Sequence, residues 1–289
     1  MPVATATRAV AVIGAGTMGS GIAQVFAASG RQVYLGDRDE PSLRRGLASI
    51  AKSLDRLIKK GTLDAAARDQ VLGRIQSATV GLPLSECALA IEAVPERLDL
   101  KKAVFQELDK ALPPDAILAT NTSSISITEL AAATSRPSRV IGMHFMNPVP
   151  MMPLVEVVRG LETSEETVNA TMEAARALGK TPVLVEDRPG FVSNRVLLPM
   201  INEAVYAYQE GVATREAIDT VMKLGMSHPI GPLALADLIG LDVCLDIMEV
   251  LQGGFGDDKY RPCPLLRQMV AAGRLGRKSG RGFYEYPDS

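Results

Sequence analysis

The feature that most constrains the fold is a glycine-rich turn near the N-terminus. Residues 8–13 form a short run of alanine and β-branched residues, followed by Gly-Ala-Gly-Thr-Met-Gly at positions 14–19 and a helical stretch over 20–29. Residues 32–35 then predict a second strand, which leads into Gly36 and Asp37. Strand, GxGxxG, helix, strand and acid, in this order, are typical of a βαβ unit that binds a dinucleotide.

Each glycine of such a turn has a physical task. Gly14 permits a tight turn, Gly16 lets the backbone approach a pyrophosphate, and Gly19 allows close packing between helix and strand. The helix N-terminus offers N–H groups and partial positive charge to the phosphates. Asp37 favours NAD, because a carboxylate repels the additional phosphate of NADP, although Arg38 beside it could hold that phosphate. The expected cofactor is therefore NAD, with NADP less favoured.

Apolar runs and helical segments alternate through most of the chain, which predicts a doubly wound, mostly parallel sheet. The runs span 88–93, 116–119, 140–143, 154–158 and 183–185, and the helices between them span 101–111, 126–133 and 165–178. At about 150 residues per domain, a chain of 289 residues suggests two domains. The prediction is an α/β, Rossmann-like domain over 1–187 with a helical insertion, and an all-α domain over 188–289.

The insertion, residues 41–72, carries a basic stripe on two helical segments around Gly61 and Thr62. On its first helix, one face is apolar (Leu47, Ile50, Leu54, Leu57 and Ile58) and the other is basic (Arg45, Lys52, Arg56 and Lys59). A solvated charged face is the simpler interpretation. The alternative is a landing site for a phosphate-bearing substrate, which needs support from elsewhere in the chain.

Polar residues follow the predicted strands where ligands of doubly wound folds bind. His144 ends one of these strands, and Glu156 is the single charge within the run 154–158. A buried carboxylate needs a partner, and His144 lies only 12 residues away along the chain, across a turn with Asn147 and three prolines. A carboxylate that fixes one imidazole nitrogen leaves the other for general acid–base work. His228, in a Ser-His-Pro loop, is more simply a turn residue.

The region after residues 187–190, a predicted hinge, is helical over 192–210, 214–223, 233–253 and 265–272, with a short tail of strand character at 282–286. Asn194 stands at the start of the first helix, where it either faces the interdomain cleft or simply begins the helix. An apolar helical surface of this size suggests a homodimer.

Composition argues against several classes of protein. The net charge is −2, aromatic residues make up 4% and tryptophan is absent, so neither nucleic acid nor an anionic membrane is an expected partner. No apolar stretch reaches the length of a membrane span. The three cysteines are widely spaced, unlike a zinc site, so we expect free thiols in a reducing, cytoplasmic setting and no metal.

Five sequence strings together resemble the short-chain L-3-hydroxyacyl-CoA dehydrogenases, with bacterial 3-hydroxybutyryl-CoA dehydrogenases as the closest likeness. They are GAGTMGSGIAQ, NTSSISIT, GMHFMNPVPMMPLVEVV, PGFVSNR and GRKSGRGFYEY. The resemblance runs from Val10 to Tyr286. One departure is Met146, where the family often has a second phenylalanine. The resemblance implies an NAD-binding N-terminal domain, a helical dimerisation domain and an active site between them.

The resemblance also implies a role for particular residues. His144 corresponds to the catalytic base, Glu156 to the group that orients it, and Ser123 and Asn194 to the polar substrate contacts. The implied contacts to coenzyme A are Ser53 and Lys60, which makes the phosphate-landing interpretation of the basic stripe the preferred one. The implied contacts to NAD are Gly14, Gly16, Thr17, Met18, Gly19, Asp37, Glu96, Lys101, Ser123, Asn147 and Lys278.

The implied reaction interconverts (S)-3-hydroxybutyryl-CoA, or another short 3-hydroxyacyl-CoA, and the 3-ketoacyl-CoA, as in fatty acid and butanoate metabolism. Two alternatives stay open. One is an NAD-dependent dehydrogenase of a free hydroxy acid or sugar acid, which would not need the basic stripe. The other is a nucleotide-binding structural protein of the same fold without turnover. Acyl chain length, direction and pathway are not determined by the sequence.

Overall fold

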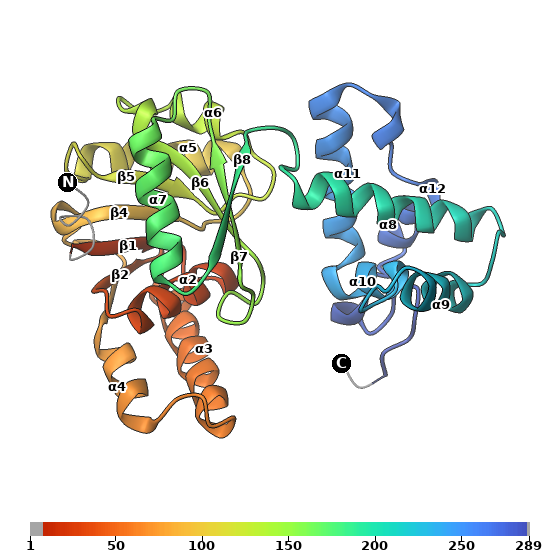
Figure 1. Cartoon of the computed structure of the whole chain (residues 1–289), viewed down its shortest axis with the longest axis horizontal. Coiled ribbons are helices and arrows are strands. Elements are labelled where there is room, and N and C mark those ends of the chain that lie inside the picture. Colours follow the sequence, from red (N-terminus) through yellow and green to blue (C-terminus); the bar gives the residue numbers. More distant parts are fainter. Residues whose placement is uncertain (1–7, 288–289) are drawn as a thin grey trace. The chain divides into compact units, whose positions relative to one another are not determined.

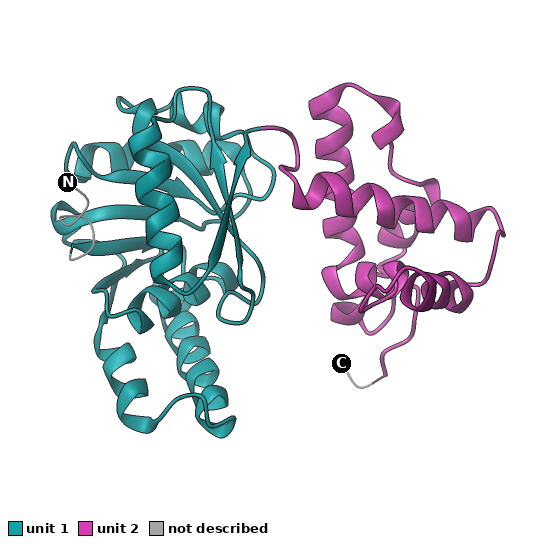
Figure 2. Cartoon of the chain, in the orientation of Figure 1, with its two compact units in different colours: residues 1–187 teal, residues 188–289 magenta. Residues whose placement is uncertain are grey.

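A computed structural model of the chain describes residues 8–287 (Figure 1). The chain divides into two compact units, Met1–Asp187 and Arg188–Ser289 (Figure 2). The first holds a sheet with helices on it, and the second is helical. The predicted fold class, an α/β domain followed by an all-α domain, is confirmed.

The described part of the first unit contains one sheet of eight strands in the order β3-β2-β1-β4-β5-β6-β7-β8. The strands from β3 to β6 run parallel in the Rossmann order. Strand β7 is antiparallel to β6, and β8 is parallel to β7. The strands are β1 (Ala9–Ile13), β2 (Val33–Gly36), β3 (Ile75–Ala78), β4 (Cys87–Glu92), β5 (Ile117–Thr120), β6 (Val140–Phe145), β7 (Leu154–Arg159) and β8 (Thr181–Glu186).

The helices of this unit connect and cover the strands, and α3 and α4 extend beyond the sheet as the predicted insertion (Figure 1). Both helices of the insertion begin with a capping aspartate, since Asp39 accepts from Ser42 N and Asp64 from Ala67 N, each at 2.7 Å. The helices are α2 (Thr17–Ala28), α3 (Glu40–Lys59), α4 (Ala65–Gly73), α5 (Leu98–Ala111), α6 (Ile127–Ala131) and α7 (Glu165–Ala177), with 3₁₀ turns at Leu84–Glu86 and Pro137–Arg139.

The sequence interpretation missed strand β3. This strand lies at the edge of the sheet and pairs only with β2 among the strands of the described residues. Its sequence, Ile-Gln-Ser-Ala, is half polar, and Gln76 and Ser77 are exposed. An edge strand tolerates such residues because only one of its sides is paired, so its periodicity is too weak to recognise.

The second unit packs its helices around a core of its own, which includes Leu198, Leu241, Cys244 and Phe283. A single helix over 233–253 was predicted, and this is wrong. Gly240, at φ +108°, separates α10 from α11. The tail 282–286 forms only an isolated bridge, Arg281 to Glu285. The helices are α8 (Ser193–Gln209), α9 (Arg215–Gly225), α10 (Pro232–Ile239), α11 (Leu241–Phe255) and α12 (Pro264–Ala271), with 3₁₀ turns at Asp258–Tyr260 and Arg277–Ser279.

Candidate functional site

The glycine-rich turn joins β1 to α2 and has the geometry of a phosphate cradle. Gly14 has φ +108°, and a Cβ there would lie 2.5 Å from the carbonyl oxygen of Ala93. A Cβ on Gly19 would lie 1.7 Å from the carbonyl oxygen of Gly14, so this glycine mainly permits contact with its own turn. Apart from its two chain neighbours, no residue of 8–287 has a heavy atom within 4 Å of the position of a Cβ on Gly16, and α2 has no side-chain cap at its N-terminus. The turn therefore presents open backbone to an anion.

A cavity of about 1110 Å³ lies beside this turn within the first unit. Asp37 lines it, with its Oδ2 accepting a hydrogen bond from Ala15 N at 2.7 Å. The cavity also has an apolar wall, formed by Val80, Leu82, Leu84, Leu100 and Val104. Glycines, a carboxylate and an apolar slot fit the diphosphate, ribose and base of a dinucleotide.

The apolar wall of this cavity escaped the sequence interpretation. Its residues come from the segment after β3 and from one face of α5, which carry no motif. Gly46 of α3 was also missed. A Cβ on it would lie 2.7 Å from the carbonyl oxygen of Ala15, so α3 packs directly on the glycine turn.

A buried ion pair lies at the ends of β4 and β5. Lys101 Nζ is 2.8 Å and 3.0 Å from the two carboxylate oxygens of Glu92 and 3.2 Å from Glu96 Oε2. The side chain of Lys101 is 1% exposed and that of Glu92 is 0% exposed. Thr120 Oγ1 donates to Glu92 at 2.7 Å. Lys101 was expected to contact the cofactor; the structure places its side chain inside the protein, paired with Glu92 and Glu96.

Glu96 organises the polar loop after β5. Its Oε1 accepts from Ser123 N at 2.9 Å, from Ser124 Oγ at 3.0 Å and from the hydroxyl of Thr122. Burial acts to raise the pKa of Glu96, but Lys101 and these donors outweigh it, and the pKa is lowered. Glu96 is thus a carboxylate that fixes the backbone around Ser123.

His144 and Glu156 lie directly opposite each other on β6 and β7. His144 Nδ1 is 2.8 Å from Glu156 Oε2, and both residues are buried. The antiparallel pairing of the two strands creates this contact, because cross-strand partners point to the same face. Asn147 lies in the turn that joins the two strands and is exposed. The expected partner of the buried carboxylate is therefore in place.

The basic stripe lies on the exposed face of α3. Arg45, Lys52, Arg56 and Lys59 are all exposed, while Ile50 and Leu54 of the predicted apolar face are 1% exposed. Ser53 is half-buried, and Lys60 is the exposed C-cap residue of the helix. Arg45 and Ser49 also line the nucleotide cavity.

Two predicted site residues, Asn194 and Lys278, belong to the second unit. Asn194 lies in the first turn of α8, where its backbone N–H donates to Gly190 O at 3.1 Å. Lys278 Nζ is 2.5 Å from the carboxylate of Asp242.

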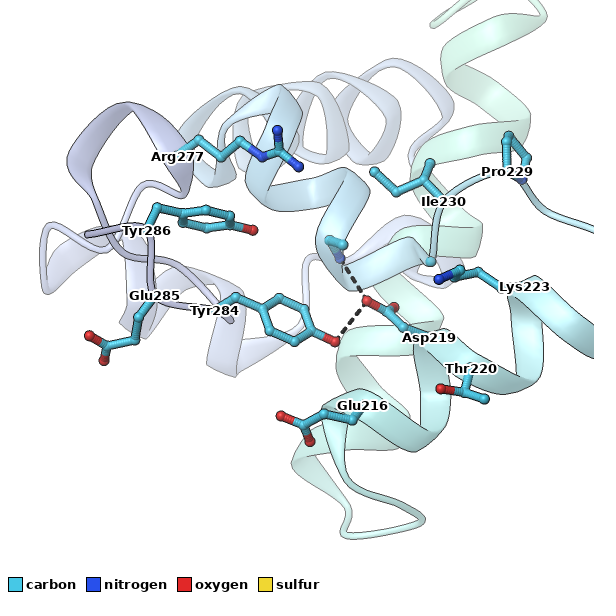
Figure 3. A pocket seen from close by; sticks show the side chains of 12 residues that line it. Glu216, Asp219, Thr220, Lys223, Pro229, Ile230, Arg277, Tyr284, Glu285 and Tyr286 are labelled. Atoms are coloured by element: carbon cyan, nitrogen blue, oxygen red, sulfur yellow. Dashed lines mark hydrogen bonds between the residues drawn. The ribbon is translucent and has the colours of Figure 1, made fainter. Parts of the chain in front are cut away.

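The second unit also has a cavity of about 490 Å³, shown in Figure 3, which none of the predicted site residues lines. Asp219 is buried in its wall and accepts from Leu233 N at 2.8 Å, Ala234 N at 3.0 Å and Tyr284 Oη at 2.8 Å. Burial and the bond to Asp219 raise the pKa of Tyr284. With three donors, Asp219 anchors the start of α10.

Within residues 8–287, no helix is long and apolar enough to cross a membrane. The same residues contain no group of three or more histidine, cysteine, aspartate or glutamate side chains able to hold a metal ion.

Comparison with known proteins covers almost the whole chain. Residues 9–188 match the NAD binding domain of 3-hydroxyacyl-CoA dehydrogenase, and residues 190–286 match its C-terminal domain. A probable 3-hydroxybutyryl-CoA dehydrogenase of Deinococcus radiodurans is 58% identical over 95% of this chain and 99% of its own. The 3-hydroxybutyryl-CoA dehydrogenase of Bradyrhizobium diazoefficiens is 52% identical over 98% and 97%. The crystal structure of (S)-3-hydroxybutyryl-CoA dehydrogenase PaaH1 from Ralstonia eutropha has a TM-score of 0.94 and 53% identity, covering 97% of this chain and 99% of that one.

Proposed function

We propose, from the premise that this chain belongs to the 3-hydroxyacyl-CoA dehydrogenase family, that it interconverts (S)-3-hydroxybutyryl-CoA and acetoacetyl-CoA. The chain is an NAD-dependent dehydrogenase. The choice of a four-carbon acyl group is supported by relatives of 52% to 58% identity that are named for that substrate. The observation that carries the mechanism is the buried pair of His144 and Glu156.

His144 is the general base for oxidation of the hydroxyl group. Glu156 accepts a hydrogen bond from the N–H at Nδ1, which selects the tautomer whose Nε2 can take the proton of the 3-hydroxyl. The resulting imidazolium is stabilised by the buried carboxylate beside it. In the opposite direction, Nε2 returns the proton to the forming hydroxyl group.

The glycine turn and Asp37 hold the nucleotide. Backbone N–H groups of the turn, including Thr17 and Met18 at the start of α2, bind the diphosphate, and Asp37 accepts from the adenosine ribose. Bound NAD supplies the acceptor for the hydride that leaves C3 of the substrate. Asn147, Lys278 and Glu96 are further proposed contacts, and Lys101 acts through Glu96.

Substrate recognition is assigned to two groups of residues. Ser123 and Asn194 hydrogen-bond the oxygens of the acyl group and orient C3. Ser53, Lys60 and the basic stripe bind the phosphates of coenzyme A, for which exposed cations on one helix face are suited.

The substrate assignment is tested by following NADH oxidation with acetoacetyl-CoA, with free acetoacetate and NADPH as paired controls. We expect rapid oxidation that requires both NADH and the thioester. Equal rates with the free acid would instead favour a dehydrogenase of free hydroxy acids. Absence of turnover while NADH still binds would favour a non-catalytic nucleotide-binding protein.

The mechanism is tested with His144→Ala. We expect kcat to fall by about 10²- to 10⁴-fold, because the general base is lost, while the affinity for NADH is kept. Glu156→Gln should lower kcat less, since the imidazole remains but its charge is no longer stabilised. Full activity of His144→Ala would remove this residue from the mechanism.

The assembly is proposed to be a homodimer formed through the second unit. Exposed apolar side chains support this, among them Val196, Val221, Leu224 and Met226, each at least 60% exposed. Light scattering coupled to size-exclusion chromatography would reveal the mass of a dimer or that of a monomer. A reducing, cytoplasmic location is proposed from the three buried, unpaired cysteines.

A further inference from the structure

The turn over residues 146–153 joins the strand of His144 to the strand of Glu156 and contains Asn147. It is internally ordered, because the N–H groups of Met151 and Met152 both donate to Pro148 O at 3.0 Å. Val149, at its centre, is 2% exposed and belongs to the core of the first unit. Contacts that fix this turn therefore also affect the geometry of the site around His144, Glu156 and Asn147.

Val149 is seated against Gly21 of α2, the helix that begins at the glycine turn. A Cβ on Gly21 would lie 2.8 Å from Val149 Cβ, 3.0 Å from its Cγ2 and 3.6 Å from Pro150 Cδ. Gly21 has no positive φ, so its backbone conformation does not require glycine. A glycine within a helix is about 1 kcal/mol less favourable than alanine, so its benefit here is the close approach of the turn.

Lys180, the residue before β8, holds the same turn by donating to carbonyl groups of the turn. Its Nζ donates to Val149 O at 2.6 Å and to Met152 O at 2.8 Å, and the residue is 9% exposed. Burial lowers the pKa of Lys180. The adjoining Thr181 N donates to Pro153 O at 2.7 Å. An ammonium buried on two carbonyl oxygens of one turn fixes the path of that turn.

We infer that Gly21 and Lys180 are positioning residues of the dehydrogenase. Gly21 seats the turn 146–153 on the cofactor-binding helix, and Lys180 ties the same turn to the start of β8. Together they set Asn147, and the strand of His144, in register with the bound nucleotide. This inference rests on the proposed roles of His144 and Asn147. Neither Gly21 nor Lys180 touches the reacting atoms in this assignment; each acts through the turn.

The first test is a double-mutant cycle between Gly21 and Val149. Gly21→Ala introduces a methyl group that displaces the turn, and we expect kcat to fall by about 10- to 100-fold, with a smaller change in the Kd for NADH. In Gly21→Ala/Val149→Gly the clash is relieved. We therefore expect kcat about tenfold above the value that the two single variants predict if their effects are independent.

The second test concerns Lys180 and includes a measurement that does not depend on turnover. Lys180→Met removes both hydrogen bonds, so the amides of Met151 and Met152 should exchange with deuterium faster in the protein without NADH. We expect kcat to fall as well, whereas Lys180→Arg, which keeps a cationic donor, should recover part of both properties.

Gly253→Ala is the matched control for Gly21→Ala, because a Cβ there meets no described heavy atom within 4 Å outside its chain neighbours and its own helix backbone.

Two results would overturn the inference. One is additive behaviour of Gly21→Ala and Val149→Gly in kcat. The other is unchanged amide exchange of the turn in Lys180→Met. Either result can coexist with an inactive His144→Ala variant, in which case the proposed mechanism stands and only the positioning role fails. An active His144→Ala variant would instead remove the mechanism, whatever the behaviour of the turn.

Discussion

At the scale of single residues, the interior of this protein shows how buried charge is used. Glu92 and Lys101 satisfy each other, and His144 is matched to Glu156. Charges buried in this way are costly unless paired, so each pair ties together two neighbouring elements of the fold, α5 with β4 and β6 with β7. The two pairs differ in proposed role: the first supports Glu96, and the second performs the proton transfer.

Asp37 is expected to set the preference for NADH over NADPH. In Asp37→Ala the ratio of kcat/KM for NADH to that for NADPH should fall by about tenfold or more, because the carboxylate no longer repels a ribose phosphate. Steady-state kinetics with both cofactors measure the ratio. Arg38→Ala is the neighbouring control and should not lower the ratio. An unmoved ratio in Asp37→Ala would show that this residue does not recognise the ribose.

The cysteines are expected to be inert in the native protein. Burial, followed by nearby carboxylates, raises the pKa of Cys87 to about 12 and that of Cys244 to about 12. Because folding favours the neutral thiol, the raised pKa of each thiol contributes to the free energy of unfolding. This contribution is complete below the ordinary thiol pKa and is lost as the pH rises towards 12. At pH 8, iodoacetamide should label the native protein slowly and the protein in guanidinium quickly at all three cysteines. Fast labelling of Cys87 or Cys244 in the native protein, read by mass spectrometry, would contradict this.

At the scale of elements, α3 has two faces of different character. Its buried face includes Leu43, Ile50 and Leu54, and Gly46 lets it pack against the glycine turn. Its exposed face carries the basic stripe. An amphipathic helix of this kind can hold the nucleotide site together and still present charge to a second ligand.

Charge reversal on α3 should weaken binding of the thioester selectively. In Arg56→Glu/Lys60→Glu we expect KM for acetoacetyl-CoA to rise by about tenfold and KM for NADH to stay within about twofold, because exposed charges act mainly on nearby phosphates. Raising the salt concentration should reduce the difference in KM for acetoacetyl-CoA between this double variant and the unmodified protein. Lys110→Glu, which removes an exposed cation from α5, is the control. An equal rise in both KM values would argue against a coenzyme A site on the stripe.

At the scale of the whole molecule, each of the two units has a hydrophobic core of its own among the described residues. One lies on the sheet of the first unit and the other among the helices of the second. Each unit therefore has its own source of stability, and a change in one core need not alter the other.

Removal of the Asp219 carboxylate should destabilise the second unit alone. Asp219→Ala leaves the N–H groups of Leu233 and Ala234 and the hydroxyl of Tyr284 without their acceptor, at a cost of about 1–3 kcal/mol for each group left unsatisfied. Amide exchange should accelerate within 188–289 and stay unchanged in the strands of the first unit. Equal acceleration in β1 and β4 would show that the two units unfold together.

Much of this architecture was predictable because its signals are local. The glycine turn, the alternation of strands and helices and the isolated Glu156 are each visible within a short window of sequence. One error occurred where the deciding contact is distant. Strand β3 owes its existence to pairing with β2. The break at Gly240 is local, but the apolar pattern on its two sides is continuous and conceals it.

By itself, the sequence determined the fold class, the nucleotide cradle and the family, because glycine positions, apolar periodicity and characteristic motifs act locally. Only the tertiary structure decided which groups meet. The register of β6 and β7 places His144 against Glu156, and the packing of α5 on β4 places Lys101 on Glu92. Packing of the turn on α2 likewise decides the contact between Val149 and Gly21. The physical reason is that a side chain's environment depends on how its own segment packs against other segments, and this packing is fixed only when the sheet and its helices come together.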